Sequence, residues 1–242
     1  MKENDFRERV TYSAPEEMLI NDVPTTIVDP HNEAFFYWAM AYRKRCERGL
    51  EPTRLIHVDR HADNYERDIN VEGGIKGCSP KKLWEIVREF RIAELIEPAL
   101  KYGIIQEGHI WYNPWPHPDR ERIHIRSTKL NERDHPTKRL IDFQDDESPI
   151  WLDIDLDAFD CIKFGQSLTY SSGTIKSRIA ITRDFLLQMP RPDLITIALS
   201  QIPVTYVNPK TVRKTLKMTL QMLQSVTNTK PPKRKKIFNL GY

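Results

Sequence analysis

Cysteine is scarce in this sequence, and its few copies form no motif. Cys46, Cys78 and Cys161 are far apart, odd in number and without any CxxC pairing. A framework of disulfides and a cysteine-based zinc site are therefore not expected. Whatever chemistry the chain performs should depend on other side chains.

Long apolar runs are also missing. No stretch approaches the length that a membrane-spanning helix needs. The first ten residues, MKENDFRERV, are charged and lack the apolar centre of a signal peptide. We therefore expect a cytoplasmic protein with no membrane partner.

An excess of positive charge is confined to one end of the chain. The formal net charge is +3, and the run KPPKRKK at residues 230–236 contributes five basic residues, so the remainder carries −2. A broad nucleic-acid-binding face is not indicated, and no nucleic-acid partner is expected. The basic tail, about residues 228–242, is either a solvated end or an electrostatic handle for an acidic leader peptide.

Apolar segments alternate between strand-like and helix-like patterns. Nine glycines against seventeen prolines favour stiff connections, and 39% hydrophobic residues suffice for a sizeable core. Helices are expected over about 30–50, with Asp29 as N-cap, and over 80–100, 175–188 and 209–226, the last capped by Asn208. Strands are expected at 25–29, 53–59, 108–115, 149–160 and 193–200.

This alternation predicts an α/β domain with a mainly parallel sheet. No linker-like break divides the chain, so we expect a single domain over 1–242, entered through a polar segment of about 1–22 that forms an entry segment or an edge element. Residues 113–149 form a long connection without sustained periodicity, and such connections often line sites.

Two short runs concentrate metal-ligand side chains at predicted strand ends. LIHVDRHAD places His57, Asp59, His61 and Asp63 at alternate positions, which share one face if the extended conformation persists. LDIDLDAFD repeats the pattern with Asp153, Asp155 and Asp157, and Asp160 is the last residue of the run. Carboxylates crowded on a buried face repel one another, so divalent cations are expected among them.

The donor types limit the choice of metal. Oxygen donors with some imidazole and no thiolate favour Mn²⁺, with Fe, Co or Zn as substitutes. So many ligands exceed one tetrahedral site and suggest two ions about 3.5–4 Å apart. Either run alone is equally typical of a hydrogen-bonded core histidine or a turn. His57 precedes the strand end and is expected only to hydrogen-bond behind a ligand.

The same residues carry a family resemblance. HVDRHAD resembles the D-x-H-x-D motif of the arginase and agmatinase ureohydrolases, and DIDLDAFD resembles their D-x-D-x-x-D motif. Asp155, Asp157 and Asp160 match the second motif, whereas a register built on Asp153 and Asp155 would misplace the third aspartate. The resemblance implies a three-layer αβα fold of the arginase–deacetylase type.

The resemblance spans roughly residues 25–227 and narrows to one branch. VDPHNEAFFYWAMA, LIHVDRHAD and LDIDLDAF are similar to small arginase-like proteins that include peptide arginases of ribosomal-peptide (RiPP) biosynthesis. Those enzymes convert arginine side chains of a precursor peptide to ornithine. The resemblance therefore implies an Mn-dependent ureohydrolase with an arginine-containing precursor peptide as partner.

The family pattern assigns roles to individual positions. It implies two Mn²⁺ ions per chain, with other divalent metals possible, held by six ligands: His31, Asp59, His61, Asp63, Asp155 and Asp157. Asp59 and Asp155 would bridge the ions, and Asp63 would also orient the nucleophile and move a proton to the leaving amine. Behind the ligands would lie His57, Asp153 and Asp160.

Several family features are missing. His31 lacks the Gly-Gly-Asp-His context of larger arginases, and no histidine matches their proton shuttle, which leaves His109, His117, His124 and His135 as unassigned candidates. The late acidic residue that grips guanidinium is replaced by ALSQIP, which offers only Ser200 and Gln201, so no substrate-binding residue is assigned.

Other functions remain open at this point. They are hydrolysis of a small guanidino metabolite, a deacetylase on the same fold, and non-catalytic binding of an arginine peptide. A deacetylase would need a paired-histidine unit, and no His-His pair occurs. The segment IWYNPWPHP, with Trp111 and Trp115, either lines a peptide groove or packs the edge of the sheet.

Overall fold

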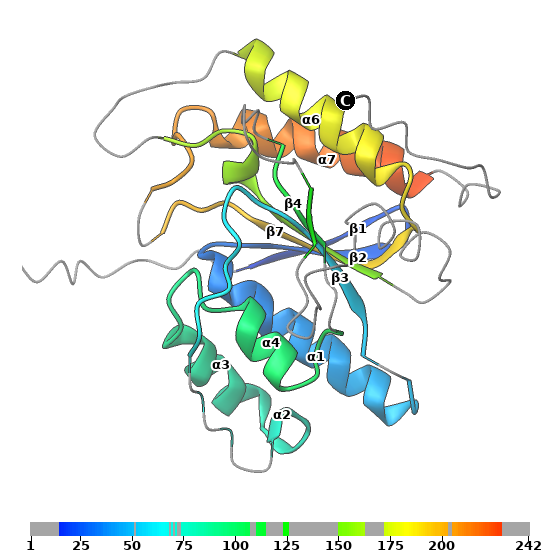
Figure 1. Cartoon of the computed structure of the whole chain (residues 1–242), viewed down its shortest axis with the longest axis vertical. Coiled ribbons are helices and arrows are strands. Elements are labelled where there is room, and N and C mark those ends of the chain that lie inside the picture. The colour runs from blue at the N-terminus through cyan, green and yellow to red at the C-terminus, as the bar shows by residue number, and fades with distance from the viewer. Residues whose placement is uncertain are drawn as a thin grey trace, which may run out of the picture.

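The computed structural model gives the chain a mixed sheet with helices on both faces (Figure 1). It describes residues 15–50, 52–67, 69, 71, 74–106, 110–114, 123–125, 150–162, 172–202 and 205–228, of which 123–125 and 172 are described by their backbone only. The predicted three-layer αβα architecture is confirmed.

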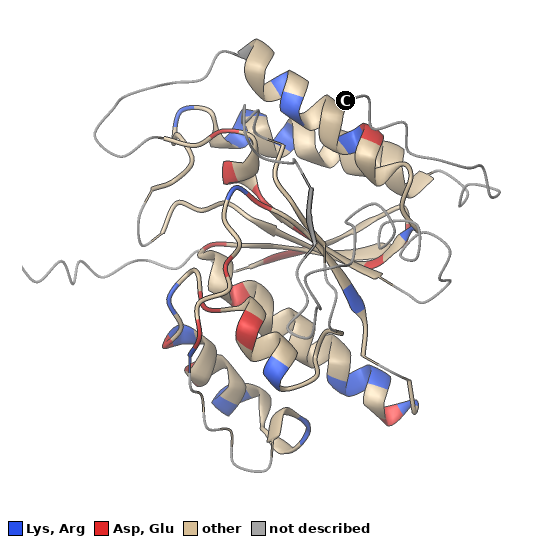
Figure 2. Ribbon diagram, in the orientation of Figure 1, with Lys and Arg blue, Asp and Glu red and all other residues tan. Residues whose placement is uncertain are grey.

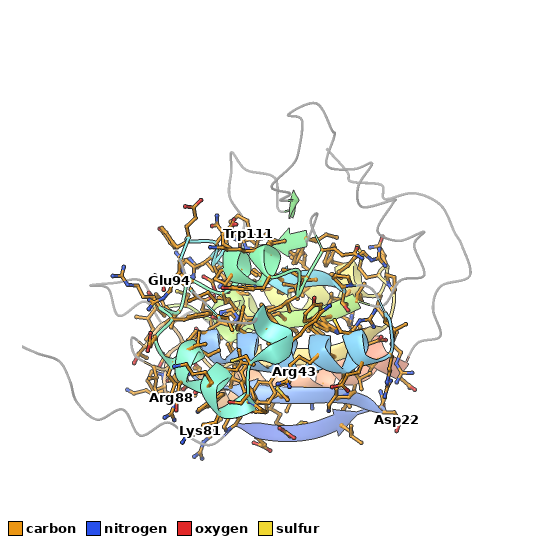
Figure 3. The ribbon with its side chains drawn as sticks, turned by 90° about the horizontal axis from the view of Figure 1, so that it is seen from below. Asp22, Arg43, Lys81, Arg88, Glu94 and Trp111 are labelled. Atoms are coloured by element: carbon orange, nitrogen blue, oxygen red, sulfur yellow. The ribbon has the colours of Figure 1, made fainter. Side chains whose placement is uncertain are left out.

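The sheet has seven strands in the order β1-β2-β7-β6-β3-β4-β5. The inner five are parallel, and the two outer strands pair antiparallel. Their bounds are β1 Glu16–Ile20, β2 Val23–Val28, β3 Arg54–Val58, β4 Ile110–Tyr112, β5 Ile123–Ile125, β6 Ile150–Asp155 and β7 Pro192–Ala198. Asp22 in the β1–β2 turn and Trp111 on β4 therefore lie toward opposite ends of the sheet (Figure 3).

One face of the sheet is covered by the N-terminal helices. They are the 3₁₀ turn η1 His31–Glu33 and the helices α1 Ala34–Glu47, α2 Gly74–Gly77, α3 Pro80–Arg88 and α4 Ile96–Lys101. Phe35 and Trp38 of α1 pack with Leu55 of β3 and Trp151 of β6. This layer therefore covers the odd-numbered positions of β3 and β6.

The other face is covered by α6 Ser172–Leu186 and α7 Val212–Asn228, which pack beside each other (Figure 1). Ile56, Leu152, Ile154 and Ile197 point into this second core. Within the helices that the structure describes, no segment is both long and apolar enough to cross a bilayer. All three cysteines are free, as expected.

Three local predictions were wrong. Asp29 does not cap a helix, because its carboxylate accepts hydrogen bonds from the backbone N–H groups of Gln201 (3.0 Å) and Ile202 (3.2 Å). The helix expected over 80–100 is divided into α3 and α4 by a turn in which the N–H of Glu94 bonds to the carbonyl of Arg91. The connection 113–149 contains strand β5. Asn208 caps the last helix as predicted, because its side-chain oxygen accepts from the N–H of Lys210 (3.0 Å) and its carbonyl accepts from the N–H of Val212 (2.9 Å), the first residue of α7.

Candidate metal centre

Four aspartates and three histidines gather where the parallel strands β3 and β6 end. They are Asp59, Asp63, Asp155, Asp157, His31, His57 and His61. The four carboxylates are at most 7% exposed, so water screens their charges poorly. The topology explains the convergence, because neighbouring parallel strands bring their carboxyl ends to one edge of the sheet.

The loop after β3 turns back instead of continuing the strand. The strand ends at Val58, and the Asp59 carboxylate accepts a hydrogen bond from the N–H of His61. Asp63 then adopts a left-handed conformation with φ of 44°, and its carbonyl accepts from the N–H of Ile96 at 3.1 Å. The predicted extended conformation does not persist, and a turn aims Asp63 at the site.

Strand β4 supports this loop from the side. The N–H of Asp59 donates to the Tyr112 carbonyl (3.1 Å), and the indole N–H of Trp111 donates to the Asp59 carbonyl (2.9 Å). Asn113 holds the carbonyl of Arg60 in the same way at 3.2 Å. Trp111 thus positions the Asp59 backbone, while Trp115 lies outside the described residues.

The end of β6 is fixed by local hydrogen bonds. One oxygen of Asp155, Oδ1, accepts from the N–H of Asp157 (2.9 Å), and the other, Oδ2, accepts from the hydroxyl of Ser200. Asp157 lies in the 3₁₀ turn η2, Leu156–Ala158, so the predicted strand alternation ends at Asp155. Ser200 follows β7 in a left-handed conformation, with φ of 53°.

The first group of ligand atoms surrounds His31. Its Nδ1 lies 2.9 Å from Asp63 Oδ2, 3.1 Å from Asp155 Oδ2 and 3.4 Å from Asp59 Oδ2. These side chains come from η1, the β3 loop and the end of β6. Three distant segments therefore converge on one ring nitrogen.

The second group surrounds His61. Its Nδ1 lies 2.9 Å from Asp157 Oδ2 and 3.6 Å from Asp59 Oδ1. Asp59 thus offers one oxygen to each group, as a carboxylate between two ions would. The side chain of His61 is 45% exposed, and the Tyr206 ring lies 5.5 Å from it, so this group opens toward solvent.

The residues expected behind the ligands divide into two sets. Asp153 Oδ2 lies 2.8 Å from His31 Nε2 and 2.8 Å from His57 Nδ1, so these three form a buried cluster of their own. Asp160 instead accepts from the Thr211 hydroxyl before α7. It belongs to neither ligand group among the described residues.

The buried carboxylates of the candidate metal centre favour positive charge beside them. Burial, with repulsion from Asp63, Asp157 and Asp155, raises the pKa of Asp59 well above its usual range. Burial alone would lower the pKa of His31, but Asp153, Asp155 and Asp63 outweigh it and raise that pKa well above the usual value.

The pKa values of His61, in the second group, and of Asp153, behind His31, are shifted in the direction that favours their charged forms. Burial opposes a charge on His61, yet Asp157 and the nearby carboxylates raise its pKa to about 9. Burial also opposes ionisation of Asp153, but His31 and His57 pull the pKa of Asp153 well below its usual range. These buried carboxylates therefore stabilise positive charge, and the two histidines keep Asp153 ionised.

These residues fit a pair of divalent cations. Buried His57 Nε2 and Asp59 Oδ2 have no hydrogen-bond partner among the described residues, although they lie 3.4 Å apart. Carboxylate and imidazole donors suit Mn²⁺ and related ions, and four aspartates balance two doubly charged ions. The donor set is compatible with the metals expected from the sequence.

Glu33 is a further buried carboxylate, two residues after His31 in η1, and its titration can be tested separately. Burial raises its pKa to about 7, against the opposing charge of Arg88 on α3 (labelled in Figure 3). The folded state therefore holds a proton that the unfolded state has lost, and stability falls as pH rises from about 4.5 to 7. Relative to the wild type, Glu33→Gln should gain up to roughly 3 kcal/mol across this range.

Urea unfolding of both proteins at pH 4.5 and pH 8, without metal, measures this difference. Glu47→Gln, which changes an exposed carboxylate at the end of α1, should leave the pH dependence unaltered. A pH-independent difference between Glu33→Gln and the wild type would contradict the assignment.

The substrate side of the site is less complete than the ligand side. Ser200 is bonded to Asp155, and the Gln201 amide donates to the carbonyls of Val207 (2.8 Å) and Leu199 (3.3 Å). Both side chains thus support the site and the β7–α7 loop. The side chains of His109, His117, His124 and His135 lie outside the described residues.

Sequence reasoning missed one polar partner of the site, Thr196. This threonine of β7 donates its hydroxyl to Asp153. The available signal was a threonine at an alternate position within the apolar strand LITIALS. A sequence pattern of this kind does not identify the partner strand.

Comparisons with known proteins give a likeness to solved structures alone. No protein-family model matches the chain, and no curated protein matches it. Among solved structures, a hypothetical agmatinase from Burkholderia thailandensis is similar with a TM-score of 0.41 and 14% identity. The match covers 84% of this chain and 57% of the agmatinase chain, so this chain spans little more than half of that protein.

Proposed function

We propose that this chain is a binuclear metal-dependent hydrolase of guanidino groups, and specifically a peptide arginase. It would convert arginine side chains of a precursor peptide to ornithine and release urea. The observation that carries the proposal is the shared carboxylate of Asp59, whose two oxygens face the His31 group and the His61 group separately. A mononuclear site would not need that arrangement.

The two groups assign the ligands. His31 and Asp63 would hold one ion, and His61 and Asp157 the other, with Asp59 contributing to both. Asp155 Oδ2 lies 3.1 Å from His31 Nδ1 and would join the first ion, and its role as a second bridge to the other ion is part of the proposal. When bound, two divalent ions supply the positive charge that lowers the pKa of water toward neutrality. The chain's own part is to balance that charge with four aspartates and to leave the His61 side open for a substrate.

Asp63 is the residue proposed to move protons. Its Oδ2 belongs to the first group, 2.9 Å from His31 Nδ1, and the left-handed turn fixes its direction. A carboxylate there can orient the attacking water, accept its proton and pass that proton to the departing amine. The C–N bond of the guanidinium breaks, and urea and an alkylamine leave.

Mass spectrometry of arginine peptides incubated with the Mn²⁺-loaded protein tests the proposal. Each converted arginine should make a peptide about 42 Da lighter, because hydrolysis removes the guanidine carbon with two nitrogens as urea. Urea from agmatine or free arginine alone would favour a small-metabolite hydrolase. Acetyl-lysine hydrolysis would favour a deacetylase, and peptide binding without any product would favour a binding protein.

A basic helix face favours a peptide over a small metabolite. Arg213, Lys214 and Lys217 recur at helical spacing on the exposed side of α7, with Lys210 one turn earlier. No Asp or Glu occurs after Asp193, so α7 carries only positive charges (Figure 2). We call these four residues the basic face.

The basic face begins beside the candidate metal centre. Thr211, which follows Lys210 in the sequence, bonds to Asp160 just after η2, and Tyr206 in the segment before it contacts the His61 ring. A peptide with its arginine at the ligand groups could therefore reach α7 with a neighbouring segment. Complementary charge would select acidic residues in that segment.

Acidic residues near the target arginine should accordingly lower KM. We expect a peptide with three glutamates on one flank to show a KM roughly tenfold below that of its glutamine counterpart, an effect that salt weakens. Arg213→Glu combined with Lys217→Glu should abolish the preference. As a control, Lys44→Glu with Lys81→Glu, on helices of the opposite layer, should preserve it.

A further inference from the structure

Three buried polar side chains form a row across three neighbouring strands. His57 of β3 is paired in register with Asp153 of β6, and Asp153 is paired with Thr196 of β7. All three are fully buried on the sheet face that α1 covers. Ionisable groups are placed there at a high desolvation cost, so a specific role is needed to explain them.

Asp153 is the centre of this row. Its Oδ2 lies 2.8 Å from a ring nitrogen of each of two histidines, His31 Nε2 and His57 Nδ1. Its Oδ1 accepts from the Thr196 hydroxyl, which in turn accepts from the indole N–H of Trp38 at 3.1 Å. A continuous chain of hydrogen bonds thus runs from α1 through the sheet to the ligand groups.

This arrangement determines where the ring protons lie. An ionised carboxylate only accepts hydrogen bonds, so each histidine must present an N–H to it. His31 then directs Nδ1 at Asp63 and Asp155, and His57 directs Nε2 at Asp59 Oδ2, 3.4 Å away. Once an ion replaces the proton on His31 Nδ1, the lone pair of that nitrogen is oriented as a metal ligand requires.

We propose that Asp153 is a positioning residue that sets the tautomer and ring direction of His31 and His57 together, with Thr196 and Trp38 holding it in place. This inference rests on the two-ion site proposed above. Ligand histidines commonly have a carboxylate partner behind them. Here the Asp153 carboxylate contacts both the proposed ligand His31 and His57, whose Nε2 faces the shared Asp59. Substitution of Asp153 should therefore affect both ligand groups.

The experiment compares Mn²⁺ affinity by calorimetry in wild type and two Thr196 variants. Thr196→Val keeps the shape and removes the hydroxyl, and should weaken binding about tenfold, within the range of partners behind metal ligands. Thr196→Ser restores the hydroxyl and should bind like wild type. A Thr196→Val affinity within twofold of wild type would overturn the inference.

A larger change is expected at the centre of the row. Asp153→Asn offers an amide N–H toward groups that are already donors and should weaken Mn²⁺ binding up to about a hundredfold. If this variant does not fold, the Thr196 pair still decides the question. Purely structural damage would lower stability without distinguishing valine from serine in ion affinity.

Ring ¹⁵N spectra provide a readout that is independent of activity. His57 in the metal-free wild type should appear as the Nδ1–H tautomer, and an Nε2–H tautomer would overturn the inference. If the wild type binds no ion while His57 shows the expected tautomer, the two-ion function fails and the hydrogen-bonded row stands. If the wild type binds two ions and Thr196→Val binds them equally well, the two-ion site stands and the positioning role of Asp153 and Thr196 fails.

Discussion

Asp59→Asn is expected to lower the rate of urea release at least about a thousandfold, which corresponds to about 4 kcal/mol in the activation barrier. The reason is that, among the described residues, Asp59 alone has a side-chain oxygen near each histidine group. Replacing one carboxylate oxygen by an amide nitrogen removes a shared anionic ligand while preserving the shape. The measurement is urea production from an arginine peptide with excess Mn²⁺.

Stability measurements separate this effect from misfolding. Without metal, Asp59→Asn should melt above the wild type at pH 8, because the raised pKa of Asp59 means that its ionisation destabilises the folded state as pH rises. With Mn²⁺ at a hundred times its Kd, the wild type should gain about 2.7 kcal/mol per ion and the variant much less. Asp22→Asn, in the exposed β1–β2 turn, should match the wild type in both conditions. A metal-induced gain in Asp59→Asn equal to the wild-type gain would exclude the shared-ligand role.

Asp157→Asn is expected to bind one Mn²⁺ where the wild type binds two, with urea release reduced at least about a hundredfold, or about 2.7 kcal/mol. The Asp157 carboxylate belongs to the His61 group alone among the described ligand atoms, since its Oδ2 lies 2.9 Å from His61 Nδ1. The His31 group, with Asp63 and Asp155, should keep its ion. Calorimetry and the spin-coupled EPR signal of a manganese pair measure the stoichiometry.

The matched control for this variant lies three residues along the chain. Asp160→Asn alters a buried carboxylate of the same segment that bonds to Thr211 and lies outside both ligand groups. It should lose some stability and keep two ions. Loss of an ion in Asp160→Asn but not in Asp157→Asn would show that the ligands are assigned in the wrong register.

Sequence motifs were sufficient to predict which side chains lie together, because histidines and aspartates at the ends of predicted strands can be recognised from short stretches of sequence. The structure brings together the six residues that the motifs selected, and their role as metal ligands stays a prediction. The reason given for their convergence was partly wrong. Asp63 and Asp157 reach the site through a left-handed turn and a 3₁₀ turn, which strand alternation does not describe.

Features that depend on tertiary contacts could not be predicted. Asp29 and Pro30 read as a helix start, but Asp29 bonds to residues more than 170 positions later. Thr196 lies opposite Asp153 only because β6 and β7 pair in one particular register. The break between α3 and α4 had a local signal, since Pro98 lies inside the helix expected over 80–100.

Asp63 and Ser200, the two left-handed residues at the candidate metal centre, lower the stability of the folded state, and interactions elsewhere in the fold must offset this loss. Each carries a side chain in a backbone region where glycine is at ease and other residues lose about 1 kcal/mol. Glycine at either position would relax the chain while deleting a carboxylate or the hydroxyl that holds Asp155. Selection for thermal stability alone would therefore favour glycine at these two positions, and the resulting protein would be more stable but inactive.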